Sequence, residues 1–323
     1  MIGVFDSGLG GLSVWREIVR VTPDEPIVYL ADQAHVPYGS RGLEEVRRLT
    51  ERAVGWLLER RCDVVVLACH TASAAALHAL RHYHPEARFV GMEPAIKPAA
   101  LHTHTGAIGV LATRTTFQGE MYASVVARFA SRVQVIQQPC SGWVELVESG
   151  CVSRDPAEGG CRGEAYGRVC ECVHPLLDAG ADTLVLGCTH FPFLEPLILL
   201  AVEEWRSERR NAREVEIIDP SQAVARQVAH VLLQAAGSSA HPSAHPSAAA
   251  SAPGAPAAHE FWTTGDPERF AAVARQLLPE LRGTSASRLV LAEPALMNSQ
   301  HRAVQQIVIP LVPDSSPHDV DSR

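Results

Sequence analysis

The chain contains almost no lysine. Its 28 basic residues include a single lysine, Lys97, and the others are arginines. A protein that forms a Schiff base through a lysine amine would therefore have to use Lys97. That residue follows Pro94 and directly precedes Pro98, in a stretch that indicates a connector. The sequence therefore disfavours pyridoxal-type chemistry.

Excess positive charge and long apolar runs are also missing. The formal net charge is -8, which disfavours nucleic acid as a partner because proteins that bind the phosphate backbone usually carry a basic face. No apolar run approaches the roughly 18 residues of a membrane span, and the first residues, MIGVFDSGLGG, lack the pattern of a signal peptide. We expect a soluble, cytoplasmic protein that binds neither nucleic acid nor a membrane.

The 8 cysteines are expected to be free thiols, because a large chain without a signal peptide rarely depends on disulfides. Four of them lie close together in the sequence: Cys151, Cys161, Cys170 and Cys172. Their C-x-C motif and irregular spacing differ from the C-x2-C pattern of structural zinc, so no metal site is expected.

Short β-branched runs alternate with longer amphipathic stretches, as in βαβ units. The predicted strands are 2–5, 27–30, 64–68, 108–111, 133–136 and 183–187. The predicted helices are 12–20, 43–60, 71–82, 117–129, one from 192 and one at 267–278. This pattern predicts an α/β fold with mostly parallel sheets.

The two halves of the chain resemble each other. GVFDSGLGG at 3–11 matches GVLATRTTF at 109–117, and VVVLACHTA at 64–72 matches TLVLGCTHF at 183–191. In each segment polar residues follow a strand, at the edge where open α/β sheets bind ligands. We therefore predict two similar domains related by a pseudo-two-fold axis, with one shared active-site cleft between them.

The predicted first domain combines residues 1–94 with 209–312, and the second comprises 95–208. Within the first, residues 237–258 consist mostly of Ala, Ser, Pro and Gly and indicate a flexible insertion. The tail, 313–323, is predicted to be disordered.

Cys69 and Cys188 occupy equivalent places in the two halves, in ACHT and GCTH, where a strand ends and a helix begins. A helix N-terminus favours an anion, so these thiols are expected to ionise more easily than free cysteine. Each alone could simply be a small buried residue. As a matched pair they suit proton removal from one face of a carbon atom and proton delivery to the other.

Asp6 and His190 are the candidates for adjusting the two thiols. Asp6 follows the first strand, and His190 lies two residues after Cys188. The alternatives are a helix N-cap for Asp6 and a capping or core histidine for His190. The DSGLGG segment lacks the spacing of a phosphate-binding loop, so its glycines are interpreted as turn and close-approach residues.

Eight segments together resemble the glutamate racemases of the aspartate/glutamate racemase superfamily: FDSGLGGLSV, LADQAHVPYGSR, ACHTAS, IGVLATRTT, QQPCSGWVELVESG, LGCTHFPFL, IDPSQAVA and TTGDPERF. The resemblance implies interconversion of L- and D-glutamate without a cofactor, to supply D-glutamate for peptidoglycan. It also implies two α/β domains and a homodimer.

By this resemblance Cys69 would take the proton from D-glutamate and Cys188 from L-glutamate, with Asp6 supporting the first thiol and His190 with Glu148 the second. The positions that match substrate-binding residues are Asp6, Ser7, Pro37, Tyr38, Gly39, His70, Thr71, Thr113, Thr116, Thr189 and His190.

His70 departs from the family pattern, which usually has asparagine there. An imidazole is bulkier than a carboxamide and titrates near pH 6.5. The change is compatible with a tolerated variation, an altered substrate or weakened activity. The alternatives to glutamate racemisation are therefore an aspartate or hydantoin racemase and a glutamate-binding protein, although Tyr38-Gly39 and LGCTHFPFL favour glutamate.

Overall fold

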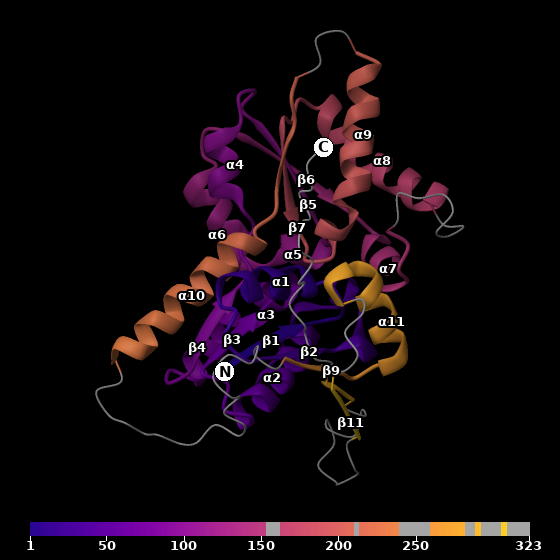
Figure 1. Ribbon diagram of the computed structural model, residues 1–323. Helices are drawn as coiled ribbons and strands as arrows, with labels where there is room; N and C mark the ends of the chain where they lie inside the picture. Colours follow the sequence, from indigo (N-terminus) through magenta and orange to yellow (C-terminus); the bar gives the residue numbers. More distant parts are fainter. Residues whose placement is uncertain (153–161, 210–212, 239–258, 282–287, 292–304, 309–323) are drawn as a thin grey trace, which may run out of the picture.

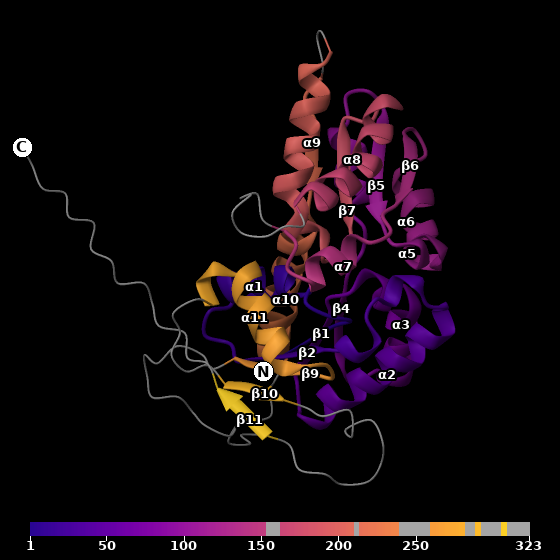
Figure 2. The same ribbon diagram turned by 90° about the vertical axis from the view of Figure 1, so that its right-hand side faces the viewer.

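The computed structural model describes residues 1–152, 162–209, 213–238, 259–281, 288–291 and 305–308. Two sheets, each flanked by helices, lie one above the other along the molecule (Figures 1 and 2). The lower sheet in these views contains the N-terminal strands, and the upper one contains strands from the middle of the chain.

The first sheet has the strand order β11-β10-β9-β2-β1-β3-β4. Its strands pair in parallel, except that β11 pairs antiparallel with β10. They are β1 (Ile2–Asp6), β2 (Ile27–Ala31), β3 (Val64–Leu67), β4 (Arg88–Gly91), β9 (Glu260–Thr263), β10 (Arg288–Leu291) and β11 (Gln305–Val308).

Both faces of this sheet are covered by helices. Val64 and Val66 of β3 belong to one apolar cluster, and Val65 and Leu67 to another. A strand buried on both faces is apolar throughout, which is why VVVL reads as an uninterrupted run. This sheet and its helices form the first unit, and the second sheet and its helices form the second unit. The helices of the first unit are α1 (Leu12–Val21), η1 (Gln33–His35), η2 (Tyr38–Ser40), α2 (Leu43–Glu59), α3 (His70–Tyr83), α10 (Ser221–Ser238), α11 (Pro267–Leu277) and η5 (Pro279–Leu281).

The second sheet has the order β6-β5-β7-β8, and all its pairs are parallel. Its strands are β5 (Ala107–Ala112), β6 (Gln134–Pro139), β7 (Thr183–Gly187) and β8 (Glu216–Ile218). Its helices are α4 (Ile96–His102), α5 (Arg114–Gln118), α6 (Glu120–Phe129), α7 (Trp143–Glu148), α8 (Arg162–Asp178), η4 (Phe191–Leu194) and α9 (Glu195–Ser207).

The strand orders reveal the repeat that the sequence predicts. The segment β2-β1-β3-β4 of the first sheet corresponds to β6-β5-β7-β8, in the same order and with the same parallel pairing. The predicted fold class, two similar α/β units, is therefore confirmed. The domain boundary at 208/209 stays a prediction. Strand β8 lies after this boundary, in the predicted first domain, but it pairs with β7 of the second sheet.

The connector expected around Lys97 is a helix instead, α4. The prediction was wrong because Pro98 lies in the first turn of α4, where a missing backbone N–H costs nothing. Lys97 is exposed there, and its ammonium nitrogen lies 5.5 Å from the centre of the Phe129 ring.

The helix predicted at 117–129 is divided into α5 and α6 at Gly119. The backbone of Gly119 is extended, and a Cβ atom at this position would lie 2.7 Å from Cβ of Ala74 in α3. The break therefore lets the two units approach each other closely.

The predicted flexible insertion and the predicted disordered tail lie almost entirely outside the described residues. Helix α10 continues to Ser238 and so includes the first two residues of the predicted insertion at 237–258. The rest of that insertion and the tail at 313–323 are not described. Among the helices that are described, none combines the length and hydropathy needed to span a membrane.

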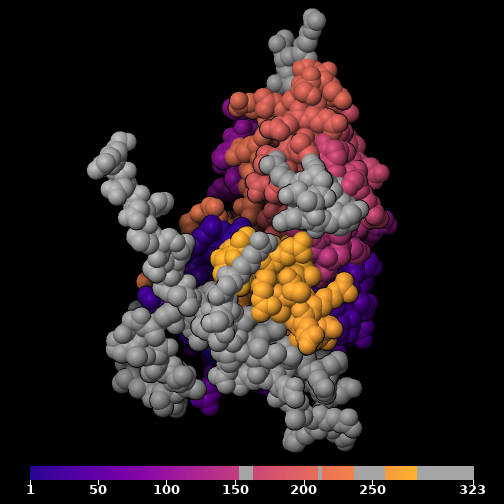
Figure 3. All heavy atoms as spheres, turned by 45° about the vertical axis from the view of Figure 1, so that its right-hand side comes forward, coloured from indigo at the N-terminus to yellow at the C-terminus, as the bar shows by residue number. Residues whose placement is uncertain are grey.

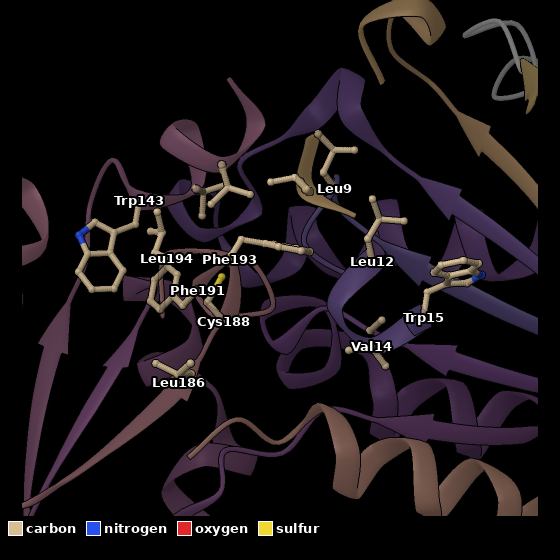
Figure 4. Close-up of a cluster of buried hydrophobic side chains, with 14 of the residues drawn as sticks. Leu9, Leu12, Val14, Trp15, Trp143, Leu186, Cys188, Phe191, Phe193 and Leu194 are labelled. Atoms are coloured by element: carbon tan, nitrogen blue, oxygen red, sulfur yellow. The ribbon is translucent and has the colours of Figure 1, made fainter. Parts of the chain in front are cut away.

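One apolar cluster extends through both units (Figure 4). Leu9 and Leu12 come from the first unit, and Trp143 and Phe191 from the second, with the two aromatic ring centres 4.7 Å apart. The units also meet at α11, which lies beside the segment containing α7 (Figure 3). There the Gln276 amide donates to the Gly150 carbonyl at 2.7 Å.

Helix α9 offers a matched test of this core. Leu197 is fully buried, whereas Leu199 is 41% exposed. We expect Leu197→Ala to lower the free energy of unfolding by about 2–5 kcal/mol, because it leaves a cavity, and Leu199→Ala to change it by about 0.5 kcal/mol or less. Denaturant titration of both variants measures this difference, and equal losses would contradict the packing described.

Candidate active site

Four chemically important segments begin where parallel strands end. Asp6 ends β1, Cys69 follows β3, Thr113 follows β5 and Cys188 follows β7. Hydrogen bonds between the two units join these strand ends to one another. The site therefore lies between the two sheets and is built from both halves of the chain.

Cys69 is the N-cap residue of α3 and is almost completely buried. Its thiol donates to the Ser7 hydroxyl, with the sulfur and oxygen 3.7 Å apart. Burial, followed by the negative charge of Asp6, raises the pKa of Cys69 to about 12, although the Ala72 N–H acts in the opposite direction. The expectation of an easily ionised thiol is therefore wrong for Cys69, because desolvation outweighs the helix terminus.

Cys188 begins a chain of polar contacts. Its Sγ lies 3.7 Å from Nδ1 of His190, and Nε2 of His190 lies 2.7 Å from Oε1 of Glu148. A Cβ atom on Gly10 would lie 2.3 Å from the His190 ring, so glycine there allows the first unit to pack against the imidazole.

His190 and Glu148 form a buried ion pair. Burial opposes the charged ring, but the hydrogen bonds to Cys188 and Glu148 outweigh it and raise the pKa of His190 well above its ordinary value. Burial also opposes ionisation of Glu148, yet the hydrogen bond and charge of His190 lower the pKa of this carboxyl. The alternatives of a helix-capping or apolar core histidine do not describe His190, whose side chain caps no helix.

Glu148 ends the short helix α7 and also contacts the first unit. Its Oε1 accepts from the Leu9 N–H at 2.6 Å, and its Oε2 accepts from the Gln33 amide at 2.8 Å. Gln33 was not singled out from the sequence, although it lies in the LADQAHVPYGSR segment. Nothing in the local pattern indicates a partner 115 positions away.

Asp6 connects the two units rather than capping a helix. One carboxylate oxygen accepts from the Gly8 N–H at 2.8 Å, and the other accepts from the Thr189 hydroxyl at 3.0 Å. The N-cap of α1 is Gly11, so the N-cap alternative for Asp6 is wrong. Burial raises the pKa of Asp6 to about 6, against the opposing effects of His190 and the two hydrogen bonds.

Three buried threonine hydroxyls form a second connection between the units. Thr71 Oγ1 lies 3.0 Å from that of Thr113 and 3.2 Å from that of Thr116, and the last two are 2.9 Å apart. Thr113 also caps α5 by accepting from the Thr116 N–H. The structure therefore brings these three predicted residues together.

The Pro37-Tyr38-Gly39 turn packs against the same part of the second unit. The Gly39 carbonyl accepts from the Thr115 hydroxyl at 2.9 Å, and the Tyr38 hydroxyl donates to Asp32 at 2.7 Å. The peptide bond preceding Pro37 is cis. Asp32 and Thr115 are positioning residues of this turn that the sequence analysis did not identify.

His70, the first residue of α3, is 2% exposed, and neither ring nitrogen has a hydrogen-bond partner among the described residues. Burial lowers the pKa of His70 to about 3. The imidazole is therefore neutral near pH 7, with one N–H donor and one lone pair available.

The cysteines are not all free. Cys151 is disulfide-bonded, which corrects the expectation of free thiols, and Cys161 lies outside the described residues. The six free cysteines among the described residues are Cys62, Cys69, Cys140, Cys170, Cys172 and Cys188.

Comparisons with known proteins identify relatives that match most of the chain. The family model described as Asp/Glu/Hydantoin racemase matches residues 2–228. The chain is 42% identical over 286 residues to a glutamate racemase from Pseudomonas paraeruginosa, covering 88% of this chain and 95% of that protein. It is also 42% identical over 276 residues to a glutamate racemase from Roseiflexus, covering 85% and 91%.

Solved structures show the same similarity. A glutamate racemase isoform from Bacillus anthracis is 30% identical, with a TM-score of 0.68 and coverage of 86% of this chain and 94% of that chain. The Escherichia coli glutamate racemase, solved with L-glutamate and the activator UDP-MurNAc-Ala, is also 30% identical, with a TM-score of 0.68 and coverage of 85% and 94%.

The raised pKa of Asp6 predicts a pH-dependent stability. Because the folded-state value, about 6, exceeds the ordinary 3.8, the stabilising contribution is complete below pH 3.8 and is lost as the pH rises through about 6. Relative to Asp6→Asn, the free energy of unfolding of the parent should fall by about 3 kcal/mol over this window. Denaturant titrations of both proteins between pH 4 and 7 test this, and parallel pH profiles would contradict it.

Proposed function

The chain belongs to the Asp/Glu/hydantoin racemase family, and from that premise we propose that it interconverts L- and D-glutamate. The observation that carries this proposal is the pair of thiols at equivalent strand ends of the two units. Each thiol has its own polar contact, Ser7 for Cys69 and His190 for Cys188. They are also close enough for negative charge on Cys188 to raise the pKa of Cys69.

Inversion at the α-carbon needs a base on one face and an acid on the other. In our proposal Cys69 removes the proton from D-glutamate and Cys188 from L-glutamate, and the opposite thiol returns a proton. The charged ring of His190, held by Glu148, donates a hydrogen bond to Cys188 and stabilises its thiolate form, and Asp6 supports Cys69. No step in this scheme requires a cofactor.

The high pKa of Cys69 means that the substrate must help to ionise it. The α-ammonium group of glutamate carries a positive charge, which stabilises a nearby thiolate. Paired with Asp6, it would also offset the negative charge that contributes to the raised pKa of Cys69. Ionisation of the thiol is thereby coupled to substrate binding.

Negative charge develops on the α-carboxylate as the proton leaves, and hydrogen-bond donors aimed at it lower the barrier. Buried hydroxyl groups are suited to this task because they are already held in position. The residues that we propose to bind substrate are Asp6, Ser7, Pro37, Tyr38, Gly39, His70, Thr71, Thr113, Thr116, Thr189 and His190.

Single-thiol variants test the assignment of the two bases. In deuterated water, Cys69→Ser and Cys188→Ser should each lower the racemisation rate by at least about 100-fold, followed by circular dichroism. The ratio of α-proton exchange from D-glutamate to that from L-glutamate should fall by about tenfold or more in Cys69→Ser, because only Cys188 remains. It should rise by a similar factor in Cys188→Ser.

Cys62→Ser serves as the matched control, since Cys62 is also a buried free thiol of the first unit but packs beside Gly3, near the end of β1 opposite Asp6. It should racemise glutamate within about twofold of the parent rate. Racemisation at the parental rate in Cys69→Ser or Cys188→Ser would refute the two-thiol mechanism.

His70 gives specific support to a second candidate function, a glutamate-binding protein with weakened activity, because neither of its ring nitrogens has a partner in the part of the chain that the structure describes. The neutral state argues against a disturbing positive charge. A neutral imidazole offers one donor and one acceptor, as a carboxamide does. We therefore favour His70 as a working substitute for asparagine in substrate binding.

Two substitutions of His70 distinguish these alternatives. His70→Asn keeps a donor and an acceptor and should change kcat/KM for glutamate by less than about fivefold. His70→Leu removes both and should lower it by about tenfold or more, because a polar group of the substrate loses its partner. A large gain in kcat/KM for His70→Asn would instead identify His70 as the cause of weakened activity.

Aspartate and hydantoins are the rival substrates, and rates measured side by side would reveal a preference for either. We further propose a cytoplasmic homodimer that supplies D-glutamate for peptidoglycan. Sedimentation analysis of the purified protein tests the dimer.

A further inference from the structure

A cluster of metal-ligand side chains lies outside the proposed racemase site, where α8 packs on α9. Cys170 and His174 are four residues apart and therefore on the same face of α8, and Glu204 comes from α9. One donor atom from each of these residues lies within 4.8 Å of the other two. The helices are neighbours in both ribbon views (Figures 1 and 2).

The imidazole of His174 is already oriented by the backbone. Its Nε2 lies 3.2 Å from the carbonyl oxygen of Ala201, which can only accept a hydrogen bond. The proton is therefore on Nε2, and Nδ1 keeps the lone pair that a metal ion requires. Metal-bound histidines commonly have this arrangement, with the second nitrogen donating to a carbonyl.

Tyr166 provides similar support for the carboxylate. It lies one turn before Cys170 on α8, and its hydroxyl donates to Oε2 of Glu204. Oε1 of Glu204 is left for a ligand. A carboxylate that binds a metal through one oxygen is often held by a hydrogen bond to the other.

We propose that Cys170, His174 and Glu204 bind a divalent transition-metal ion, with Zn²⁺ as the best fit. Thiolate, imidazole and carboxylate are the three ligand types that zinc binds in proteins, and a water molecule completes a tetrahedral site. With metal–ligand bonds of about 2.0–2.3 Å, ligand atoms are roughly 3.5 Å apart. The donors must therefore move together by about 1 Å, which the exposed side chain of Glu204 permits.

The C-x-C motif does not describe this site. Cys172 lies in the buried apolar cluster and interacts with Cys140, whereas Cys170 is partly exposed beside Glu204. The sequence spacing therefore pairs Cys170 with Cys172, whereas the structure places Cys170 beside Glu204. The site is open to ions from solvent, and occupancy would fix α8 against α9.

Cobalt(II) is the probe that tests the proposal, because thiolate-bound Co²⁺ has an intense charge-transfer absorption. The reduced, chelator-treated protein should bind one equivalent of Co²⁺ with this band, and Zn²⁺ should displace it. Cys170→Ser should abolish the band, and His174→Gln or Glu204→Gln should weaken binding about 100-fold. Tyr166→Phe should weaken it by about tenfold, since it removes an outer hydrogen bond.

Two controls separate this site from the rest of the chain. Glu203→Gln changes the exposed neighbour of Glu204 and should leave Co²⁺ affinity unchanged. The double variant Cys69→Ser/Cys188→Ser should keep the band, because the site is independent of the proposed racemase thiols. A circular dichroism spectrum of each variant checks that it is folded.

Thermal unfolding gives a second measurement. Zn²⁺ should raise the Tm of the parent protein and have no such effect on His174→Gln, because an ion that binds only the folded state stabilises it. A charge-transfer band that survives Cys170→Ser and disappears with the two racemase thiols would overturn the proposal. The absence of Co²⁺ binding at micromolar concentration would also overturn it.

Discussion

The carboxylate of Glu148 is the interaction on which the rest of the site depends. It binds the His190 ring on its own unit and, at the same time, the Leu9 N–H and the Gln33 amide of the first unit. A buried carboxylate is tolerated only when its hydrogen-bonding capacity is filled, and here a cation and two neutral donors fill it. Removing Glu148 would leave the buried charge of His190 uncompensated. Because the same carboxylate also binds the first unit, it determines both the orientation of the two units and the environment of Cys188.

Burial also explains the unusual ionisation in the site. Asp6, Cys69 and His190 are all almost inaccessible to solvent, and their pKa values shift in directions set by their neighbours. His190 is held charged by partners, whereas Cys69 has no cationic partner among the described residues and stays protonated. A positive charge supplied by the substrate therefore stabilises mainly the thiolate of Cys69, because Cys188 already has the charged His190 ring beside it.

The sequence predicts the elements better than the contacts between them. Uninterrupted apolar strands and matched ACHT and GCTH turns locate both thiols because these are local patterns. The partners of Glu148 could not be predicted, since they depend on how the two units pack against each other. The pKa expectation for Cys69 was wrong for a related reason: a helix terminus is visible in the sequence, but the burial of the thiol in the folded chain is not. Similarly, prolines around Lys97 suggested a connector, although Pro98 occupies a helix position that tolerates it.

The two units repeat the backbone but not the chemistry at its edge. Equivalent strand ends provide Cys69 and Cys188, while different loops give one a serine hydroxyl and the other a histidine–glutamate pair. If the protein racemises glutamate as proposed, the two enantiomers have equal free energies in solution, so kcat/KM must be the same in both directions. Unequal surroundings of the thiols can therefore give the two enantiomers different kcat and different KM values, but they cannot make kcat/KM differ between the two directions. In the proposed mechanism the backbone symmetry allows proton transfer at both faces of the α-carbon, and the asymmetry of the side chains determines which enantiomer is held more tightly.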